Sequence, residues 1–175
     1  GEEYKEMAEG DGHLKTGSVR RLIVGEPVGV FYGYRFDGIF QNEEECKQQT
    51  SSAAPIGVGL RRYKDLNGDG KVDAVNDREI LGNANPKFFG GLTNTFAYKG
   101  FELNVFLQYS VGNKILNYNA MELETPTGGQ NAYADMVNRW TPENPSNIYP
   151  KATTNRNVLV SDRFIEDGSY LKLKT

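Results

Sequence analysis

One short segment of the chain combines the residue types that hold a hard metal ion in proteins. Asp65, Asn67 and Asp69 alternate along it, Gly70 follows directly, and Asp73 comes three residues later. In calcium-binding loops, oxygen ligands at positions 1, 3 and 5 surround the ion, and glycine at position 6 allows the sharp bend. The spacing therefore predicts a structural Ca²⁺ site in this segment.

The remaining ligands of such a site are less regular. Position 12, which should be a bidentate acid, is Asn76, and Asp77 stands one residue later. Position 7 would supply a backbone carbonyl and position 9 a carboxylate or a bound water. The expected metal ligands are Asp65, Asn67, Asp69, Lys71, Asp73 and Asp77. The open alternative is a loop that holds itself together through Asx turns without metal.

Residues suited to catalysis are scarce. The chain has one His and one Cys, which excludes a zinc site built from several such ligands. His13 and Cys46 have no feature that would join them as a nucleophilic pair. No nucleophile or acid–base pair stands in a defined strand-and-loop context, so we predict that the chain is not an enzyme.

The charge of the chain is nearly balanced, since 20 Lys and Arg stand against 23 Asp and Glu. A net charge of −3 excludes the basic surface that a nucleic-acid-binding protein needs. No run of roughly 20 apolar residues is present, so no transmembrane helix is encoded. Abundant glycine (20 residues) and aromatic residues (11%) favour β structure with long loops, in a soluble domain or in a piece of an outer-membrane barrel.

Four stretches alternate between apolar and polar or small residues, which is typical of half-buried strands. They lie near residues 28–40, 88–98, 101–111 and 163–174. Two long loops, 41–86 and 112–161, separate them, and we expect a short helix at 132–140 within the second loop. Loops of this length are usually functional or disordered.

A tight turn, Lys99-Gly100, joins 88–98 and 101–111 into a hairpin. The odd positions of its second arm are apolar: Phe101, Leu103, Val105, Leu107 and Tyr109. The even positions are polar, with Phe106 as the exception. Each arm has the roughly 9–11 residues that a tilted strand needs to cross a bilayer. Both long loops then fall on the side opposite the short turn, which is the layout of outer-membrane barrels.

Several stretches, taken together and in order, resemble the late barrel of SusC/RagA-type TonB-linked outer-membrane proteins. They are residues 25–34, 37–40, 63–83, 85–88, 98–103, 139–145 and 164–174. The likeness covers roughly residues 20–175. One departure concerns the acidic loop, because the family usually places an Asp three residues after the Asp that matches Asp73. Here Asp77 is four residues on, with Val75 inserted, and this leaves the calcium assignment open.

The resemblance implies an all-β fragment, residues 1–175, from the C-terminal part of a large transmembrane β-barrel of antiparallel strands with long extracellular loops. It also implies TonB-dependent uptake of oligosaccharides, or of peptides, across the outer membrane of a Gram-negative bacterium of the Bacteroidetes type. The expected partners are membrane lipid, the substrate, a SusD-like surface lipoprotein that acts as a lid, and TonB through a part outside this chain. Residues 65–77 would then lie in an extracellular loop.

Two other hypotheses remain: a secreted, calcium-stabilised β domain that binds glycan, and a fragment of a glycoside hydrolase with an accessory calcium loop. Either should bury its apolar strand faces, yet the odd-numbered residues of 101–109 would be exposed unless something covered them. A barrel segment should instead leave two sheet edges unpaired. Loop aromatics could stack on sugars, although we expect them to fold the loops onto themselves: Tyr63, Tyr118, Tyr133, Trp140 and Tyr149.

Overall fold

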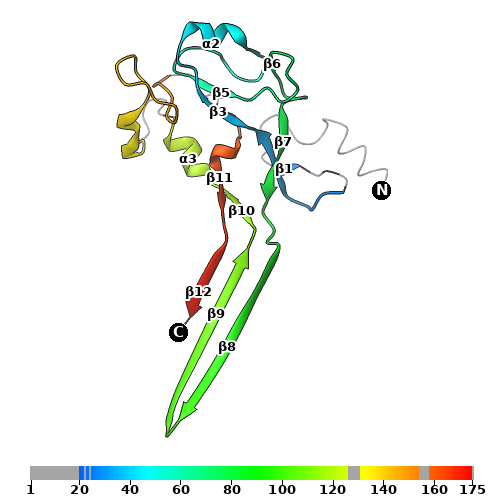
Figure 1. The fold of residues 1–175 in the computed structure, drawn as a ribbon, viewed down its shortest axis with the longest axis vertical. Coiled ribbons are helices and arrows are strands. Elements are labelled where there is room, and N and C mark those ends of the chain that lie inside the picture. The colour runs from blue at the N-terminus through cyan, green and yellow to red at the C-terminus, as the bar shows by residue number, and fades with distance from the viewer. Residues whose placement is uncertain (1–19, 22, 24, 126–130, 154–157, 175) are drawn as a thin grey trace.

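The computed structural model shows a head of short elements on top of a long, narrow stem (Figure 1). It describes residues 20–21, 23, 25–125, 131–153 and 158–174. The stem consists of β8 (Phe88–Tyr98), β9 (Phe101–Val111) and β12 (Tyr170–Lys174). None of the helices in these residues is long and apolar enough to cross a lipid bilayer.

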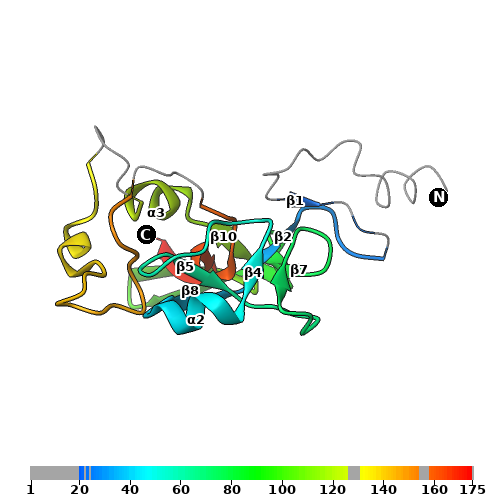
Figure 2. The same cartoon turned by 90° about the horizontal axis from the view of Figure 1, so that it is seen from above.

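All other elements belong to the head. Its strands are β1 (Arg20–Arg21), β2 (Val30–Tyr34), β3 (Phe36–Ile39), β4 (Thr50–Ser51), β5 (Arg61–Tyr63), β6 (Lys71–Val72), β7 (Arg78–Asn83), β10 (Lys114–Leu116) and β11 (Ile165–Asp167). Its helices are α2 (Glu43–Gln48), α3 (Tyr118–Leu123) and the 3₁₀ helices η1 (Ala134–Asn138) and η2 (Asp162–Phe164). Figure 2 looks down on the head and shows β5 between α2 and α3.

The stem is an antiparallel sheet in the order β12-β9-β8. Strands β8 and β9 pair without a break from Phe88 opposite Val111 to Tyr98 opposite Phe101. The predicted strands 88–98 and 101–111 are therefore confirmed in both extent and partner. The sheet is open, since β8 and β12 each have only one neighbour among the described strands, and this is the pair of unpaired edges expected from the sequence.

The hairpin closes at a turn of two residues. Lys99 has φ of 46° and Gly100 φ of 84°. Positive φ at both central residues is the signature of the type I′ turn, whose twist matches that of the flanking strands. Glycine adopts this conformation without steric cost, whereas lysine does so against its usual preference. The predicted tight turn is thus confirmed.

The stem has one apolar and one polar face, because residues paired across an antiparallel ladder lie on the same side. Leu92 pairs with Leu107 and Phe96 with Leu103. The apolar face comprises Phe88, Gly90, Leu92, Asn94, Phe96, Tyr98, Phe101, Leu103, Val105, Leu107, Tyr109, Val111, Leu171 and Leu173, with Asn94 as its one polar residue. The polar face comprises Thr93, Thr95, Glu102, Asn104, Gln108, Ser110, Lys172 and Lys174, together with Phe89, Phe106 and Tyr170.

Phe106, the exception among the even positions of β9, covers a glycine of the neighbouring strand. A Cβ atom placed on Gly91 would lie 2.8 Å from the Phe106 ring. The ring therefore occupies the space that a side chain at Gly91 would fill, a known way of stabilising glycine in a strand. Phe106 has a packing role here, and it does not disturb the two-faced pattern of the stem.

The predicted strand 28–40 is two strands in the structure. Its first half, β2, pairs with β7, and its second half, β3, pairs with β5. A register shift between Phe31 and Tyr32 adds an irregularity within β2. Val30 and Phe31 are both buried, so the two faces of β2 are covered and the expected half-buried strand is wrong here. Alternation alone cannot show that one stretch serves two partners.

The segment 41–86 is not a plain loop but contains α2 and β4 to β7. Helix α2 begins at Asn42, whose side chain accepts a hydrogen bond from the Glu45 amide over 2.9 Å. Three glutamates occupy its first turn, where negative charge favours the helix N-terminus. The predicted loop is therefore wrong at α2, because the Asn42 cap and the acidic first turn favour a helix in a segment whose composition is typical of a loop.

The later segments also differ in detail from expectation. The short helix predicted at 132–140 is present as η1. The predicted strand 163–174 is divided into η2, β11 and β12, with β11 pairing with β10 and β12 with β9. Gly168 lies at the division, where a Cβ atom would collide with the Asn113 side chain. The all-β, antiparallel character of the chain is nevertheless confirmed, and parallel pairing between named strands is confined to β4 and β6.

Two hydrophobic clusters hold the head together. One contains Tyr34, Tyr63 and Val72. The other contains Ala120, Met121 and Phe164. Leu159 packs against the first cluster, so the segment 112–161 contacts the segment 41–86 there. They lie at the end of the stem opposite the Lys99-Gly100 turn (Figure 1), as the layout of the predicted loops requires.

Candidate functional site

The predicted calcium loop lies between β5 and β7, with β6 in its middle. Asp65 accepts hydrogen bonds from the amides of Gly68 and Gly70, each over 2.7 Å. Both glycines have positive φ, 75° and 80°. The carboxylate at position 1 therefore curls the loop around itself. The bend at Gly70 was predicted from the spacing, and the bend at Gly68 was not.

The middle of the loop is held by side chains that bond to nearby amides. Asn67 Oδ1 accepts from the Asp69 amide over 3.2 Å, and Asn67 Nδ2 donates to Asp69 Oδ2 over 3.0 Å. Asp69 Oδ1 accepts from the Lys71 amide over 2.8 Å. These are Asx turns, the local bonds by which Asn and Asp stabilise turns without any ligand.

The last two acidic residues close the loop. Asp73 Oδ1 accepts from the amides of Val75 and Asn76, each over 2.8 Å. These bonds, that of Asn76 first, lower the pKa of the Asp73 carboxyl because they stabilise its charged form. Asp77 is fully buried and accepts from the amides of Leu66 over 2.8 Å and Asp73 over 2.7 Å. Asp77 thereby ties the first half of the loop to the second.

The six predicted ligands are thus neighbours in one loop. A side-chain oxygen of each predicted ligand except Lys71 accepts from a backbone amide, and the Lys71 ammonium lies 4.0 Å from Asp73 Oδ2. Within the described residues, no group of three or more acidic, His or Cys side chains converges as a metal site. The oxygen donors suit Ca²⁺ by type, whereas the observed arrangement does not assemble them around one point. Asp77 serves as a buried clamp. Calcium binding by this loop stays a prediction.

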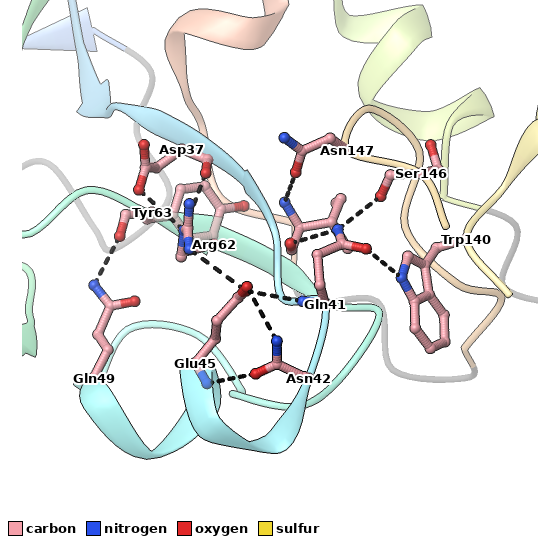
Figure 3. A network of polar contacts seen from close by, with 11 residues as sticks. Asp37, Gln41, Asn42, Glu45, Gln49, Arg62, Tyr63, Trp140, Ser146 and Asn147 are labelled. Atoms are coloured by element: carbon pink, nitrogen blue, oxygen red, sulfur yellow. Dashed lines mark hydrogen bonds and ion pairs between the residues drawn. The ribbon is translucent and has the colours of Figure 1, made fainter. Parts of the chain in front are cut away.

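A network of polar contacts joins the two long segments of the head (Figure 3). Gln41 is its centre: its Nε2 donates to the carbonyls of Ile39 over 2.8 Å and Ser146 over 3.1 Å. Its Oε1 accepts from the indole Nε1 of Trp140 over 2.9 Å. Asn147 Oδ1 accepts from the Ile39 amide over 3.1 Å. Three residues of the second segment therefore bind one short stretch of the first.

Arg62 makes further polar contacts between neighbouring elements of the head. Its Nε donates to the carbonyl of Asp37 over 3.1 Å and lies 3.0 Å from Asp37 Oδ2. Its Nη1 lies 3.6 Å from Glu45 Oε2, so one guanidinium links β3, β5 and α2. Gln49 Nε2 donates to the carbonyl of Tyr63 over 2.9 Å. Figure 3 shows these contacts around the strands β3 and β5. The contacts themselves were not predicted from the sequence.

The loop aromatics serve the fold of the head in two clear cases. Tyr63 and Trp140 are buried, with 3% and 9% of their surface exposed. Tyr63 packs on Tyr34 with ring centroids 5.7 Å apart. Tyr118 and Tyr133 remain exposed, and Tyr149 stacks against the guanidinium of Arg163 at 5.4 Å. The expectation that these aromatics fold the loops is confirmed for Tyr63 and Trp140.

The apolar face of the stem is uncovered. Leu92, Leu103 and Leu173 each expose more than half of their surface: 53%, 59% and 58%. Phe96, Tyr98 and Phe101 near the turn are exposed as well. An exposed apolar surface of this extent marks a contact with protein, ligand or membrane.

Cys46 and His13 are the two residues considered above for nucleophilic catalysis. Cys46 lies on α2, and burial followed by the nearby charges of Glu43 and Glu45 raises the pKa of its thiol. A raised thiol pKa disfavours the nucleophilic thiolate. His13 lies outside the described residues.

The curated proteins that are similar to this chain are TonB-dependent receptors. TonB-dependent receptor P3 from Formosa agariphila is 36% identical over 163 residues, which is 93% of this chain and 16% of the receptor. TonB-dependent receptor P26 from the same organism is 34% identical over 157 residues, covering 89% of this chain and 16% of the receptor. No protein-family model matches the chain. The chain thus spans about one sixth of the length of these relatives, and it is homologous to a segment of the TonB-dependent receptors.

Proposed function

We propose that the chain forms part of the barrel wall and of the extracellular head of a TonB-dependent transporter of the SusC/RagA type. The stem would stand in the outer membrane of a Gram-negative bacterium with its apolar face in lipid and its polar face toward the lumen. The two-faced stem is the observation that carries this proposal, because strands of membrane barrels alternate in this way. The similarity to TonB-dependent receptors over nearly the whole chain supports it.

The dimensions of the stem fit a membrane. From Phe88 to Tyr98 the strand rises roughly 33 Å at about 3.3 Å per residue. A tilt of roughly 40° reduces this to about 25 Å, the height of the apolar band in such barrels. Aromatic residues stand at both ends of the apolar face: Phe88 and Tyr109 beside the head, and Tyr98 and Phe101 beside the turn. Such placement is typical of the aromatic girdles at the two membrane interfaces.

The head would then stand on the extracellular side, since long loops of bacterial barrels lie outside and short turns inside. There it would border the mouth of the barrel, where a SusD-like lipoprotein could close over the substrate. TonB would act through a part outside this chain. Oligosaccharides, or peptides, are the proposed substrates. The uncovered apolar face weighs against the alternative of a secreted, calcium-stabilised β domain that binds glycan.

A cell-envelope fractionation tests the membrane placement. An antibody against this chain should detect a band in the outer membrane, several times larger than the 19.5 kDa of this chain. The band should shift between unboiled and boiled samples, as folded barrels do. A soluble band near 19.5 kDa that does not shift would overturn the proposal.

Transport itself needs a separate test. A strain lacking the full-length protein should lose TonB-dependent uptake of labelled oligosaccharide or peptide, and the wild-type gene should restore it. Purification of the tagged protein in detergent should recover a surface lipoprotein in the same complex. Unchanged uptake of every substrate class in the deletion strain would contradict the transport function. Recovery of no lipoprotein would remove the lid from the proposal.

The calcium hypothesis is tested on the same full-length protein. Calcium bound by residues 65–77 would brace a long connection near the lid or the ligand. The double variant Asp65→Ala, Asp69→Ala should then lose calcium-dependent stabilisation and weaken lid binding or transport. Unchanged transport and lid binding in this variant would remove that role from the loop.

A further inference from the structure

Arg61 on β5 is a buried cation. Only 8% of its surface is exposed. Its Nη1 donates to Thr125 Oγ1 over 3.0 Å and its Nη2 to the carbonyl of Glu124 over 3.3 Å. Both acceptors are neutral, and among the described residues its Nε donates to no acceptor. A guanidinium in such surroundings is costly unless a negative charge compensates it.

The carboxylate of Glu124 is paired with a second arginine. Oε2 of Glu124 lies 2.8 Å from both Nε and Nη2 of Arg163, and so forms a two-pronged ion pair with that residue. Glu124 is itself 9% exposed. Arg61, Glu124 and Arg163 together therefore hold two positive charges and one negative charge. The ring of Phe164, 5.7 Å from the Arg61 guanidinium carbon, offers partial compensation only.

Burial is the largest influence on the pKa of Arg61 and lowers it; the electrostatic effects of Tyr63 and Glu124 raise this pKa, and that of Arg163 lowers it. Arginine nevertheless keeps its proton in proteins.

A cavity of about 30 Å³ lies beside this cation. It is lined by Pro55, Leu60, Arg61, Tyr63, Thr125 and Pro150, among others. This volume admits roughly two water-sized groups, which is also the scale of a halide ion or of a carboxylate group. Four of its lining residues, Arg61, Tyr63, Thr125 and Thr153, carry a side-chain hydrogen-bond donor.

The orientation of these donors favours an anion over a cation. The Tyr63 hydroxyl oxygen accepts from the Leu159 amide over 3.3 Å, so its hydrogen points elsewhere. The Thr125 oxygen accepts from Arg61, which likewise leaves its hydrogen to donate. Charge-assisted hydrogen bonds to an anion would satisfy the Arg61 Nε and both hydroxyls at once.

We propose that the cavity bordered by Arg61, Tyr63 and Thr125 binds a compact monovalent anion, either a free halide ion or the carboxylate group of a larger ligand. The site lies in the head, apart from the apolar face of the stem. Tyr63 packs against Val72 of the loop 65–77, whereas Arg61 and Thr125 lie outside that loop. The wall of the cavity combines apolar groups with the Arg61 guanidinium, whose Nε donates to no acceptor among the described residues.

The test is a thermal-unfolding titration of the full-length protein purified in detergent. Sodium bromide, sodium formate and sodium glucuronate are the probes, with the bulky anion of a morpholine sulfonate buffer salt holding the ionic strength constant. Bromide should raise the Tm of the wild type in a saturable manner, by about 1–3 °C. Arg61→Gln should abolish this rise. Arg62→Gln, a neighbour on the same strand that is already paired with Asp37 and Glu45, should keep it.

The two sources of the anion are distinguished by the probes. Saturable stabilisation by bromide and formate but not glucuronate identifies a site for free ions, whereas stabilisation by glucuronate as well identifies a site that reaches the carboxylate of a sugar acid. No rise beyond the ionic-strength control in the wild type, or an equal rise in Arg61→Gln, would overturn the proposal.

A second measurement covers the case in which Arg61→Gln does not fold. Crystals of the wild-type full-length protein soaked in bromide should show an anomalous peak within about 3.5 Å of the Arg61 guanidinium, at hydrogen-bonding distance. Absence of a peak there, with peaks at other cationic sites, would contradict the assignment.

Discussion

The indole Nε1 of Trp140 donates a hydrogen bond of 2.9 Å to Oε1 of Gln41, across 99 residues of sequence. Gln41 follows β3, and Trp140 follows η1, so the bond ties the first long segment of the head to the second (Figure 3). The backbone repeats the connection nearby, where the Lys151 amide donates to the carbonyl of Gly59 over 2.8 Å. The two segments therefore form one structural unit above the stem.

Trp140→Phe should loosen this unit. The change leaves the Gln41 acceptor without its donor, at a cost of about 1–3 kcal/mol. Local opening, and with it proteolytic cleavage within 131–153, should become roughly 5- to 150-fold faster. The cleavage rate of the full-length protein in detergent measures it. Tyr118→Phe, at a position with 58% exposure, is the control and should cleave at the wild-type rate. Equal cleavage rates for Trp140→Phe and Tyr118→Phe would show that the hydrogen bond between Trp140 and Gln41 does not stabilise the head.

Asp77→Asn should destabilise the loop 65–77. Each carboxylate oxygen of the buried Asp77 accepts one backbone amide. An asparagine presents a donor to one of these amides, and the unsatisfied group costs about 1–3 kcal/mol. Hydrogen exchange of the peptide that contains the loop should therefore accelerate. Asp69→Asn, at an exposed position of the same loop, should have a much smaller effect. Faster hydrogen exchange in Asp69→Asn than in Asp77→Asn would contradict the role of Asp77 in joining the two halves of the loop.

The C-terminal half of this loop should open in acid. The folded pKa of Asp73 lies below its ordinary value because the amides of Asn76 and Val75 stabilise the carboxylate. The bonds therefore contribute stability above the ordinary aspartate pKa, and this is lost as the pH falls through the lowered folded pKa. A dye on Val75→Cys, in a Cys46→Ser background, should report a transition below the ordinary aspartate pKa. A transition that Asp73→Asn leaves unchanged would assign it to another group.

A charge on the apolar face of the stem should prevent assembly. Val105→Lys would place an ammonium on the apolar face, which is proposed to contact lipid, at a cost of about 2–4 kcal/mol. Asn104→Lys changes the neighbouring residue on the polar face and should be tolerated. The amount of heat-modifiable receptor in the outer membrane compares the two. Equal amounts would argue against a lipid contact at this face.

The stem could be predicted from sequence because its order is local. Phe88–Tyr98 and Phe101–Val111 are joined by two residues, and each carries its own alternation, so extent, turn and register follow from neighbouring positions. Of the head, the sequence predicts the bend at Gly70 in the loop 65–77 and the short helix η1. The buried clamp role of Asp77 did not follow from spacing, because it depends on amides at Leu66 and Asp73 that only the folded loop brings together.

The remaining elements depend on distant partners. Residues 28–40 read as one strand, yet their two halves pair with β7 and β5, which come from a segment expected to be a loop. Strands of two or three residues, such as β4 and β6, carry no periodicity of their own. The N-cap at Asn42 with its acidic first turn was the one local signal that could have revealed α2.

The most direct test of the central claim is the environment of two neighbouring residues of β9. Nitroxide spin labels are placed at Leu103→Cys and at Asn104→Cys in the full-length protein, with Cys46 replaced by serine, in lipid vesicles. The label at 103 should be relaxed strongly by oxygen, which dissolves in lipid, and the label at 104 by a water-soluble nickel chelate. Equal accessibility of both positions to the nickel chelate would contradict a stem that crosses the membrane.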